Sequence, residues 1–302
     1  MTATSDMILE RRRIRRRLTF WRVLAVVAVL AFLAAVLPWP GGRPAGDHVA
    51  RIWIDGLITA DADRSERLRE IAEDEEARAL IVHINSPGGT VVASEILYQN
   101  LRDISEVKPV VAVMASAAAS GGYITALAAD RIIAHGNTIT GSIGVVAEVP
   151  NFARLLDSLG IEVTQVKSAP LKGEPSLFTE PAPGAFEAQD ALVEDMYGWF
   201  KALVAERRGM SEAEVAEVAN GRAYTGRQAL ALGLIDALGN EDAALAWLEE
   251  EHGIDLGVPR DWHWDDDGLP LPFFDFGDAA ARLLGLERPL MMPVPQLFAV
   301  MQ

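Results

Sequence analysis

Apolar and polar residues follow two different periods along most of the chain, and their alternation predicts strands interleaved with helices. Nearly continuous apolar runs at 79–84 and 109–115 are typical of strands buried in a parallel sheet. Residues 49–54 alternate like a strand and precede a turn at 55–56. Shorter strands are expected at 131–134, 145–149 and 161–166. Apolar residues at helical spacing predict helices at 63–77, 90–101, 120–129, 152–159, 184–208, 211–219 and 240–251. The predicted fold class is therefore α/β with a mainly parallel sheet.

The N-terminal segment has a different pattern. Residues 11–17 carry six arginines, and an apolar run follows at 18–38. At about 1.5 Å per residue, that run can span the roughly 30 Å hydrocarbon core of a bilayer. Arginines on its N-terminal side predict a cytoplasmic N-terminus at 1–17 and a body on the extracytoplasmic side of the inner (cell) membrane. A cleaved signal peptide is the alternative, but no clean Ala-x-Ala site follows the run. We expect a single-pass anchor at 18–38 and a linker rich in Pro and Gly at 39–47.

Composition excludes several classes of function. The chain has no cysteine, which excludes disulfides, thiol catalysis and zinc held by cysteine. Its net charge is −16, and no nucleic-acid partner is expected because such a partner requires a basic patch. There is no His-Glu-x-x-His motif and no tight cluster of histidines and carboxylates, so neither a metal nor a cofactor is expected. The acidic run at 265–267 fits a solvated loop.

The stretch Met114–Tyr123 joins a buried strand to the start of a helix through small residues. Gly121 and Gly122 allow another backbone to approach closely. The first N–H groups of the helix are unpaired and can face a developing anion. Because Ser120 lies at this junction, we predict that it is a nucleophile. The stretch alone leaves open a simpler interpretation, in which Ser116 and Ser120 are small packing residues or a helix cap.

Two further strand ends carry candidate groups, since sites in parallel sheets gather at the carboxyl ends of strands. Asn85–Gly89 is predicted to be a turn whose Gly88 and Gly89 N–H groups could hold an oxyanion, with an ordinary connecting turn as the alternative. A phosphate-binding loop is not expected because Gly-x-x-x-x-Gly-Lys-Ser/Thr is missing. Residues 168–183 hold four prolines and no periodicity, which predicts a long loop.

A serine nucleophile needs a base. The chain has five histidines: His48, His83, His135, His252 and His263. None is placed by the sequence pattern beside both Ser120 and an acid that could orient it, so a Ser-His-Asp triad could be assembled only by guessing. Lysine is the other candidate, because burial or positive neighbours lower its pKa and Ser-Lys dyads are a known variant. Lys108 and Lys201 are expected to be solvated. Lys167 and Lys172 flank the start of the long loop, with a surface charge as the alternative for each.

Four motifs follow one another in a specific order: Asn85-Ser-Pro-Gly-Gly89, Ala118-Ala-Ser-Gly-Gly-Tyr123, Thr138-Ile-Thr-Gly-Ser-Ile-Gly-Val145 and the long segment Gly221–Gly239. Through them, the chain resembles the bacterial signal peptide peptidase A family in its short, single-repeat form. The resemblance covers roughly residues 48–250.

This resemblance implies a Clp-protease/crotonase-like fold and a membrane-anchored serine endopeptidase that works by acyl transfer. It implies Ser120 as nucleophile, Lys172 as general base, and Gly89 and Gly121 as the oxyanion hole. The chain departs from the family's pattern around the second lysine, so Lys167 stays a rival base. The resemblance also implies apolar peptide substrates, such as signal-peptide remnants. It further implies a homo-oligomeric ring in which the serine and lysine of one site can come from neighbouring chains.

The expected protease domain is therefore 48–252, and 253–302 is an extension outside the resemblance. Its apolar end, 290–301, could pack on the body, line an oligomer contact or occupy the protease groove, and it is too short and too rich in proline for a second membrane span. Two other functions stay open. A crotonase-type acyl-CoA enzyme would use the same glycines without a serine nucleophile, and a membrane-anchored scaffold would have lost catalysis.

Overall fold

The computed structural model describes residues 21–22, 24–28, 46–263 and 298–300. The chain divides into two compact units, residues 1–46 and 47–302. Within the described ranges, no helix combines the length and the apolar character that a membrane span requires. Most of the predicted anchor at 18–38, the basic segment at 1–17, most of the linker at 39–47 and the acidic run at 265–267 lie outside the described residues.

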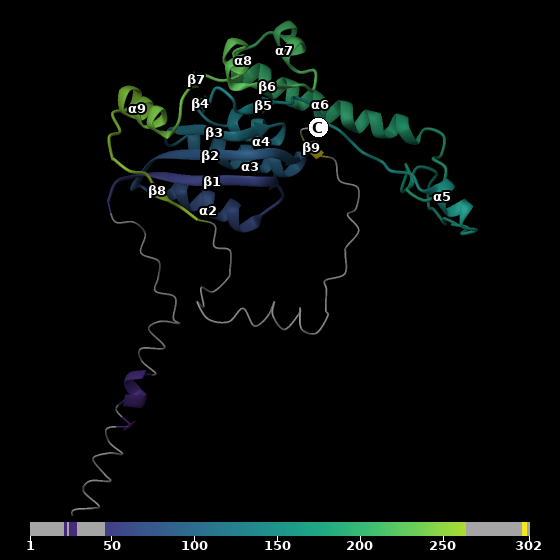
Figure 1. Cartoon of the computed structure of the whole chain (residues 1–302), viewed down its shortest axis with the longest axis horizontal. Coiled ribbons are helices and arrows are strands. Elements are labelled where there is room, and N and C mark those ends of the chain that lie inside the picture. The colour runs from purple at the N-terminus through teal and green to yellow at the C-terminus, as the bar shows by residue number, and fades with distance from the viewer. Residues whose placement is uncertain (1–20, 23, 29–45, 264–297, 301–302) are drawn as a thin grey trace, which may run out of the picture. The chain divides into compact units, whose positions relative to one another are not determined.

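The second unit alternates strands and helices (Figure 1). Its strands are β1 (His48–Ile58), β2 (Ala77–Thr90), β3 (Val110–Ala119), β4 (Arg131–Ala134), β5 (Ile139–Gly141), β6 (Ala223–Thr225), β7 (Ala237–Leu238), β8 (Arg260–Asp261) and β9 (Phe298–Val300). Its helices are α2 (Ala62–Glu73), α3 (Val91–Ser105), α4 (Gly121–Leu127), α5 (Ala153–Ser158), α6 (Ala185–Arg208), α7 (Glu212–Val218), α8 (Gly226–Ala231) and α9 (Glu241–His252).

All the described strands of this unit join one sheet. The main order is β6-β5-β3-β2-β1-β8, with β4 beside β3, β7 beside β4 and β9 beside β2. The central strands are parallel, with Ile52 opposite Val82 and Val82 opposite Ala112. Among the described strands, antiparallel pairing is confined to β5 with β6 and β2 with β9. The predicted α/β class with a mainly parallel sheet is confirmed.

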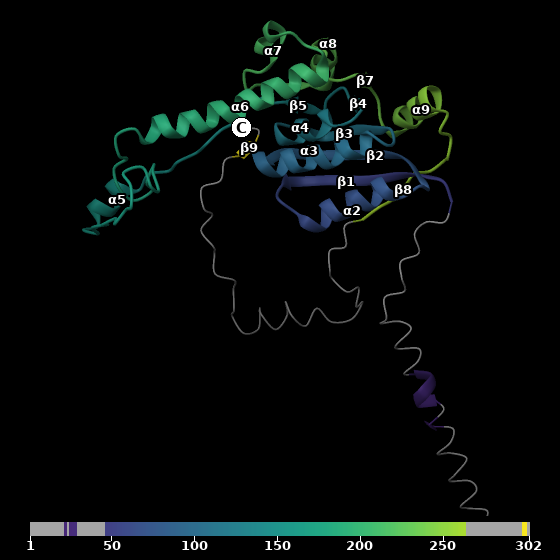
Figure 2. The ribbon, with the colours of Figure 1, turned by 180° about the vertical axis from the view of Figure 1, so that it is seen from behind.

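Both faces of the sheet are covered, which explains the uninterrupted apolar runs in β2 and β3. Residues such as Val82 and Ala112 pack into a core that includes side chains of α2, α3, α4 and α6. Their sequence neighbours Ile81 and Val111 point to the other face, where they pack with Leu248 of α9. In both views, α5 and the first part of α6 lie away from the sheet (Figures 1 and 2).

Two predicted turns are wrong because the strands run through them. β2 continues through Asn85–Thr90, and Gly89 allows this because a β-carbon at its position would lie 1.9 Å from the carbonyl oxygen of Ile58. Only a residue without a side chain can pair with β1 so closely. β1 passes the predicted turn at 55–56 with a shift of register between Asp55 and Leu57, and extends to Ile58.

Two predicted strands are also wrong. Residues 161–166 are exposed and belong to no described strand, since no neighbouring strand offers them a hydrogen-bonded ladder. The strand expected at 145–149 lies instead at Ile139–Gly141, where it pairs with Ala117–Ala119 of β3. The predicted helix at 63–77 is shorter, because it ends at Glu73 and Ala77 already begins β2.

Candidate active site

Ser120 is held in a rare backbone conformation between β3 and α4. Its φ is 52° and its ψ is −115°, a combination that costs a residue with a side chain about 1–3 kcal/mol. Its N–H donates a 2.8 Å hydrogen bond to the carbonyl of Gly141, which fixes the turn against β5. The residue is fully buried, and its Oγ has no hydrogen-bond partner among the described residues. Its side chain makes no capping bond, so the simpler interpretation as a side-chain helix cap is wrong.

The glycines predicted to form an oxyanion hole lie together beside this turn. A β-carbon on Gly121 would lie 3.0 Å from the backbone nitrogen of Gly89 and 2.3 Å from Oγ of Ser94. A β-carbon on Gly122 would lie 2.7 Å from the carbonyl oxygen of Ser86. The end of β2 and the start of α4 therefore meet backbone to backbone, because glycine occupies the contact positions. Ser120, Gly121 and Gly89 are brought together within one chain.

Buried hydroxyl groups hold this arrangement in place. Oγ of Ser86 accepts a 3.1 Å hydrogen bond from the Gly88 N–H, and Oγ of Ser94 donates a 3.0 Å bond to the Thr90 carbonyl. Oγ1 of Thr140 donates a 2.7 Å bond to the Ala118 carbonyl just before the turn. Our reasoning from sequence assigned no role to Ser86, Ser94 or Thr140. Ser86 and Thr140 lie inside two of the four sequence motifs, which could have pointed to them. No sequence pattern around Ser94 indicates its role.

The two lysines of the long loop differ in their environment. The ammonium group of Lys167 forms an ion pair with the carboxylate of Glu174, whose side chain is only 2% exposed. This hydrogen bond is the main cause that holds the pKa of Glu174 below its ordinary value. Lys172 is exposed and lies in a turn in which its N–H donates a 3.1 Å bond to the Ala169 carbonyl. The structure does not bring Lys172 to Ser120 within one chain, since Oγ of Ser120 has no partner in the described residues.

The other candidate bases are engaged elsewhere. Nε2 of His83 lies 2.5 Å from a carboxylate oxygen of Glu241, and the ring stacks on Trp53 with centroids 4.1 Å apart. The ammonium group of Lys201 lies 4.1 Å from the ring centroid of Tyr197. No described histidine reaches Oγ of Ser120, because that oxygen has no partner among the described residues. These arrangements leave no Ser-His-Asp triad around Ser120 in the described part of the chain.

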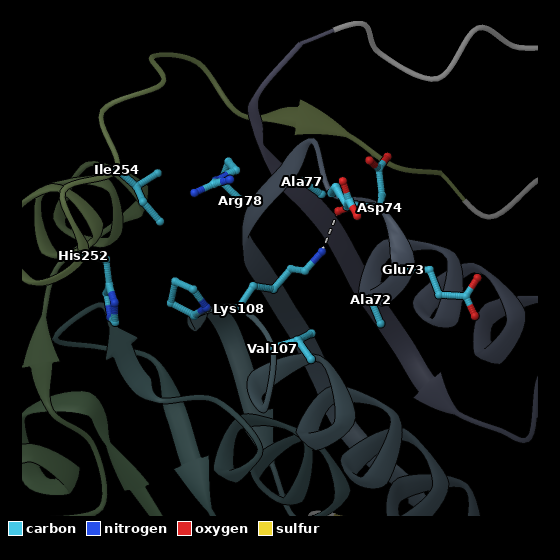
Figure 3. Close-up of a pocket in the computed structure, with 11 residues that line it drawn as sticks. Ala72, Glu73, Asp74, Ala77, Arg78, Val107, Lys108, His252 and Ile254 are labelled. Carbon is cyan, nitrogen blue, oxygen red and sulfur yellow. Dashed lines mark hydrogen bonds between the residues drawn. The ribbon is translucent and has the colours of Figure 1, made fainter.

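Lys108 lines a cavity of about 550 Å³ that lies away from Ser120 (Figure 3). The cavity is at the amino ends of β2 and β3, whereas Ser120 follows the carboxyl end of β3. The Lys108 ammonium donates bonds of 2.6 and 2.8 Å to the carbonyls of Ile71 and Asp74 at the end of α2. Burial lowers the pKa of Lys108. The expectation that this lysine is solvated is wrong, because its side chain is half-buried and caps the end of α2. Across the described residues, no group of histidines and carboxylates could hold a metal ion.

A strained serine between a buried strand and a helix, next to the close backbone contact of Gly121 with Gly89, is typical of a serine-type hydrolase. Residues 102–255, about half of the chain, match the model of peptidase family S49. The chain belongs to this family, and the predicted resemblance to signal peptide peptidase A is thereby confirmed. Family membership supports a serine-type peptidase and speaks against an acyl-CoA enzyme.

Named relatives agree with this assignment. A protein of Synechocystis sp. that carries the name protease is 40% identical over 72% of this chain and 79% of its own length. Protease 4 of Haemophilus influenzae is 34% identical over 68% of this chain and 31% of the relative. Serine protease SPPA of Arabidopsis thaliana chloroplasts is 36% identical over 63% of this chain and 28% of the relative. The chain therefore spans about a third or less of these two longer proteins.

A solved structure of a mutant membrane-bound, stomatin-specific protease covers 67% of this chain and 84% of that chain. The sequences are 21% identical, and the TM-score of 0.44 is too low to add to the family assignment.

Proposed function

We propose that this chain is a membrane-anchored serine endopeptidase that uses Ser120 as nucleophile and Lys172 as general base. The observation that carries the proposal is the strained, buried Ser120 beside the backbones of Gly89 and Gly121. Strain of this kind persists only when the surrounding structure enforces it, and it clusters at functional sites. We infer a Clp-protease/crotonase-like architecture for the domain at 48–252.

The proposed reaction is acyl transfer in two stages. Neutral Lys172 takes the hydroxyl proton of Ser120 while Oγ attacks the carbonyl carbon of a peptide bond. The N–H groups of Gly89 and Gly121 stabilise the oxyanion that forms. The lysine then gives its proton to the leaving amine, which departs and leaves an ester on Ser120. Water attacks this ester with the same lysine as base, and the acid product leaves the free serine.

The choice of Lys172 over Lys167 follows from charge. The ammonium group of Lys167 is already engaged by the carboxylate of Glu174, whereas a general base must be available to the hydroxyl of Ser120. Lys172 is exposed in the single chain, so a surface that encloses it beside Ser120 would have to come from another chain.

Exposed apolar residues on both sides of Lys172 in the sequence offer a contact surface for a second copy of the chain. Exposed residues of this region include Leu155, Leu159, Ile161, Val166 and Phe178. Exposed apolar residues that gather on one surface are typical of interaction sites. We therefore propose a homo-oligomeric ring in which Lys172 of one chain serves Ser120 of its neighbour.

The membrane assignment rests on the apolar run at 18–38 and the arginines before it. We propose a single-pass anchor in the inner (cell) membrane, with the N-terminus in the cytoplasm and the protease domain on the other side. An active site close to the bilayer suits apolar peptides such as signal-peptide remnants. A similar protein of Enterococcus faecium, 34% identical over 73% of this chain, carries the name signal peptide peptidase SppA.

The test is cleavage of a fluorogenic apolar peptide by the full chain in detergent. Ser120→Ala should abolish turnover, and Lys172→Ala should lower kcat by about 10²–10⁴-fold, which is the usual contribution of a general base. Lys167→Ala and the matched control Lys201→Ala should retain most of the activity. Wild-type activity should rise with pH as the base loses its proton. Full activity in Ser120→Ala would refute the proposal, and a dead Lys167→Ala beside an active Lys172→Ala would assign the base to Lys167.

A further inference from the structure

Ser94 of α3 lies beside the two glycines of the proposed oxyanion hole. Its side chain is fully buried. A β-carbon on Gly121 would lie 2.3 Å from Oγ of Ser94 and 3.0 Å from the backbone nitrogen of Gly89. Oγ of Ser94 also donates a 3.0 Å hydrogen bond to the carbonyl of Thr90, the residue that follows Gly89. One hydroxyl group therefore contacts both of the segments that carry the proposed N–H donors.

The helix α3 does not itself require this hydroxyl group. Thr90 is the N-cap of α3, and the carbonyl of an N-cap residue already accepts the first hydrogen bond of its helix from the backbone N–H four residues later, here that of Ser94. A second bond from the hydroxyl to the same carbonyl slightly destabilises a helix. Serine is also a poorer helix former than alanine. The contact with Gly121 therefore explains a buried serine at this position better than the needs of α3 do.

The same contact sets how closely α3 and α4 approach each other at the site. α4 begins at Gly121, and the two helices lie side by side in both views (Figures 1 and 2). Because Gly121 has no side chain, Oγ of Ser94 is the nearest atom on the side where a β-carbon would be. A shift of α4 toward α3 would move the Gly121 N–H away from its present place beside Gly89. Such a shift matters, because an oxyanion needs its donors at about 2.7–3.1 Å.

We propose that Ser94 is a positioning residue, whose hydroxyl group holds the N–H groups of Gly89 and Gly121 at the spacing that the oxyanion requires. The inference rests on the proposed function, because it assigns a supporting residue to the same site. Ser94 touches neither the substrate nor Ser120 in this role. It acts on the reaction only through the backbone at Gly121 and Thr90.

The size of the effect follows from what its removal leaves in place. Ser94→Ala keeps both N–H donors and loses the atom that separates α3 from α4. Loss of a whole oxyanion-hole donor lowers kcat by about 10²–10³-fold, and misplacement of a reacting group by about 1 Å costs about 10²-fold. A smaller displacement should lower kcat by about tenfold. The KM should stay unchanged, because these bonds strengthen in the transition state and contribute less to binding of the substrate.

The first test asks whether the contact exists in solution and does not depend on activity. Urea unfolding is measured for Ser94→Ala, Gly121→Ala and the double variant. The new methyl group of Gly121→Ala meets Oγ in the presence of Ser94 and loses that close contact in Ser94→Ala. The double variant should therefore be less destabilised than the sum of the two single variants. Gly198→Ala is the control partner, because a β-carbon there meets nothing within 4 Å and its effect should add to that of Ser94→Ala. Simple additivity in both pairs would overturn the proposal.

The second test measures catalysis by the full chain in detergent with a fluorogenic apolar peptide. Ser94→Ala should lower kcat about tenfold at unchanged KM, and a peptide boronate, which forms a tetrahedral adduct with a serine, should bind about tenfold more weakly. Tyr123→Phe is the matched control, because it also removes a buried hydrogen bond to a backbone carbonyl, but at Leu234. It should lower the unfolding midpoint and keep the kcat of wild type. An unchanged kcat in Ser94→Ala, or an equal loss in Tyr123→Phe, would overturn the proposal.

Labelling with a fluorophosphonate separates this inference from the function on which it rests. A wild-type protein that is not labelled at Ser120 would refute the proposed function, and the role of Ser94 would fall with it. If Ser120 is labelled in wild type and Ser94→Ala is labelled and turns over substrate at the same rates, the inference alone is overturned.

Discussion

The backbone strain at Ser120 predicts that glycine at this position stabilises the protein more than alanine does. Ser120→Ala keeps a side chain at a φ of 52°, whereas Ser120→Gly removes it. Both variants lack the hydroxyl, so the difference between them does not depend on what the hydroxyl contacts. Relief of strain is worth about 1–3 kcal/mol. The greater freedom of glycine in the unfolded chain costs about 0.4–1 kcal/mol. The glycine variant should therefore be more stable than the alanine variant by about 0.5–2 kcal/mol.

Urea unfolding followed by circular dichroism, together with thermal unfolding, measures this difference. A change of 1 kcal/mol shifts the midpoint of thermal unfolding by about 2–4 °C in a domain of this size, so the shift should be about 1–8 °C. Ser116 of β3 provides the matched control, because it is an exposed serine whose φ is not positive. Ser116→Gly should be less stable than Ser116→Ala by about 0.5–1 kcal/mol. The order of glycine and alanine should thus reverse between the two positions.

The reasoning would be refuted if the alanine variant were more stable than the glycine variant at both positions. If Ser120→Gly is less stable than Ser120→Ala, the turn is not strained. The protein would then hold no backbone strain at the proposed nucleophile, and the observation that carries the proposed function would lose its force.

Three further predictions concern groups around the site. Gly89→Ala should destabilise the protein by at least about 2 kcal/mol and abolish activity, because the new methyl group would meet a backbone carbonyl of β1. The control Gly198→Ala, in open space on α6, should stabilise the protein by about 0.5–1 kcal/mol. Similar unfolding midpoints for the two variants would contradict this prediction. Tyr123→Phe should cost about 1–2 kcal/mol in urea unfolding, since it leaves a buried carbonyl without its 2.8 Å hydrogen bond, and an unchanged midpoint would show that the bond contributes nothing. The pKa of Glu174 is lowered, chiefly by its hydrogen bond with Lys167, so its contribution to stability is present above the ordinary pKa of 4.5 and is lost as pH falls through the lowered pKa. Glu174→Gln should therefore weaken the loss of unfolding free energy that wild type shows over this acidic range. An identical loss in the variant would count against the ion pair.

The fold class could be predicted because the central strands are buried on both faces. A short, continuous apolar run such as 79–84, flanked by charged helical segments, is best explained as a buried strand. The structure has strands at 79–84 and at 110–115. Glycine-rich segments were harder to assign, because glycine favours turns and also permits close strand pairing. Residues 85–89 were predicted as a turn and form a strand, since the decisive contact with Ile58 is not local in sequence.

Non-local contacts also explain what was missed at the candidate site. Ser120, Gly121 and Gly89 could be named from their motifs. The pairing of β9 with β2 could not, because three residues carry too weak a pattern to specify a partner more than 200 positions away. The ion pair of Lys167 with Glu174 depends on a turn that no periodicity predicts.

The most direct measurement of the central claim is mass spectrometry of the wild-type protein after reaction with a fluorophosphonate. We predict a single adduct on the peptide that contains Ser120, formed faster as pH rises and at a rate that falls to background in Lys172→Ala. An adduct on a different serine, or no adduct under conditions in which the protein cleaves peptides, would contradict the assignment of Ser120 as the nucleophile.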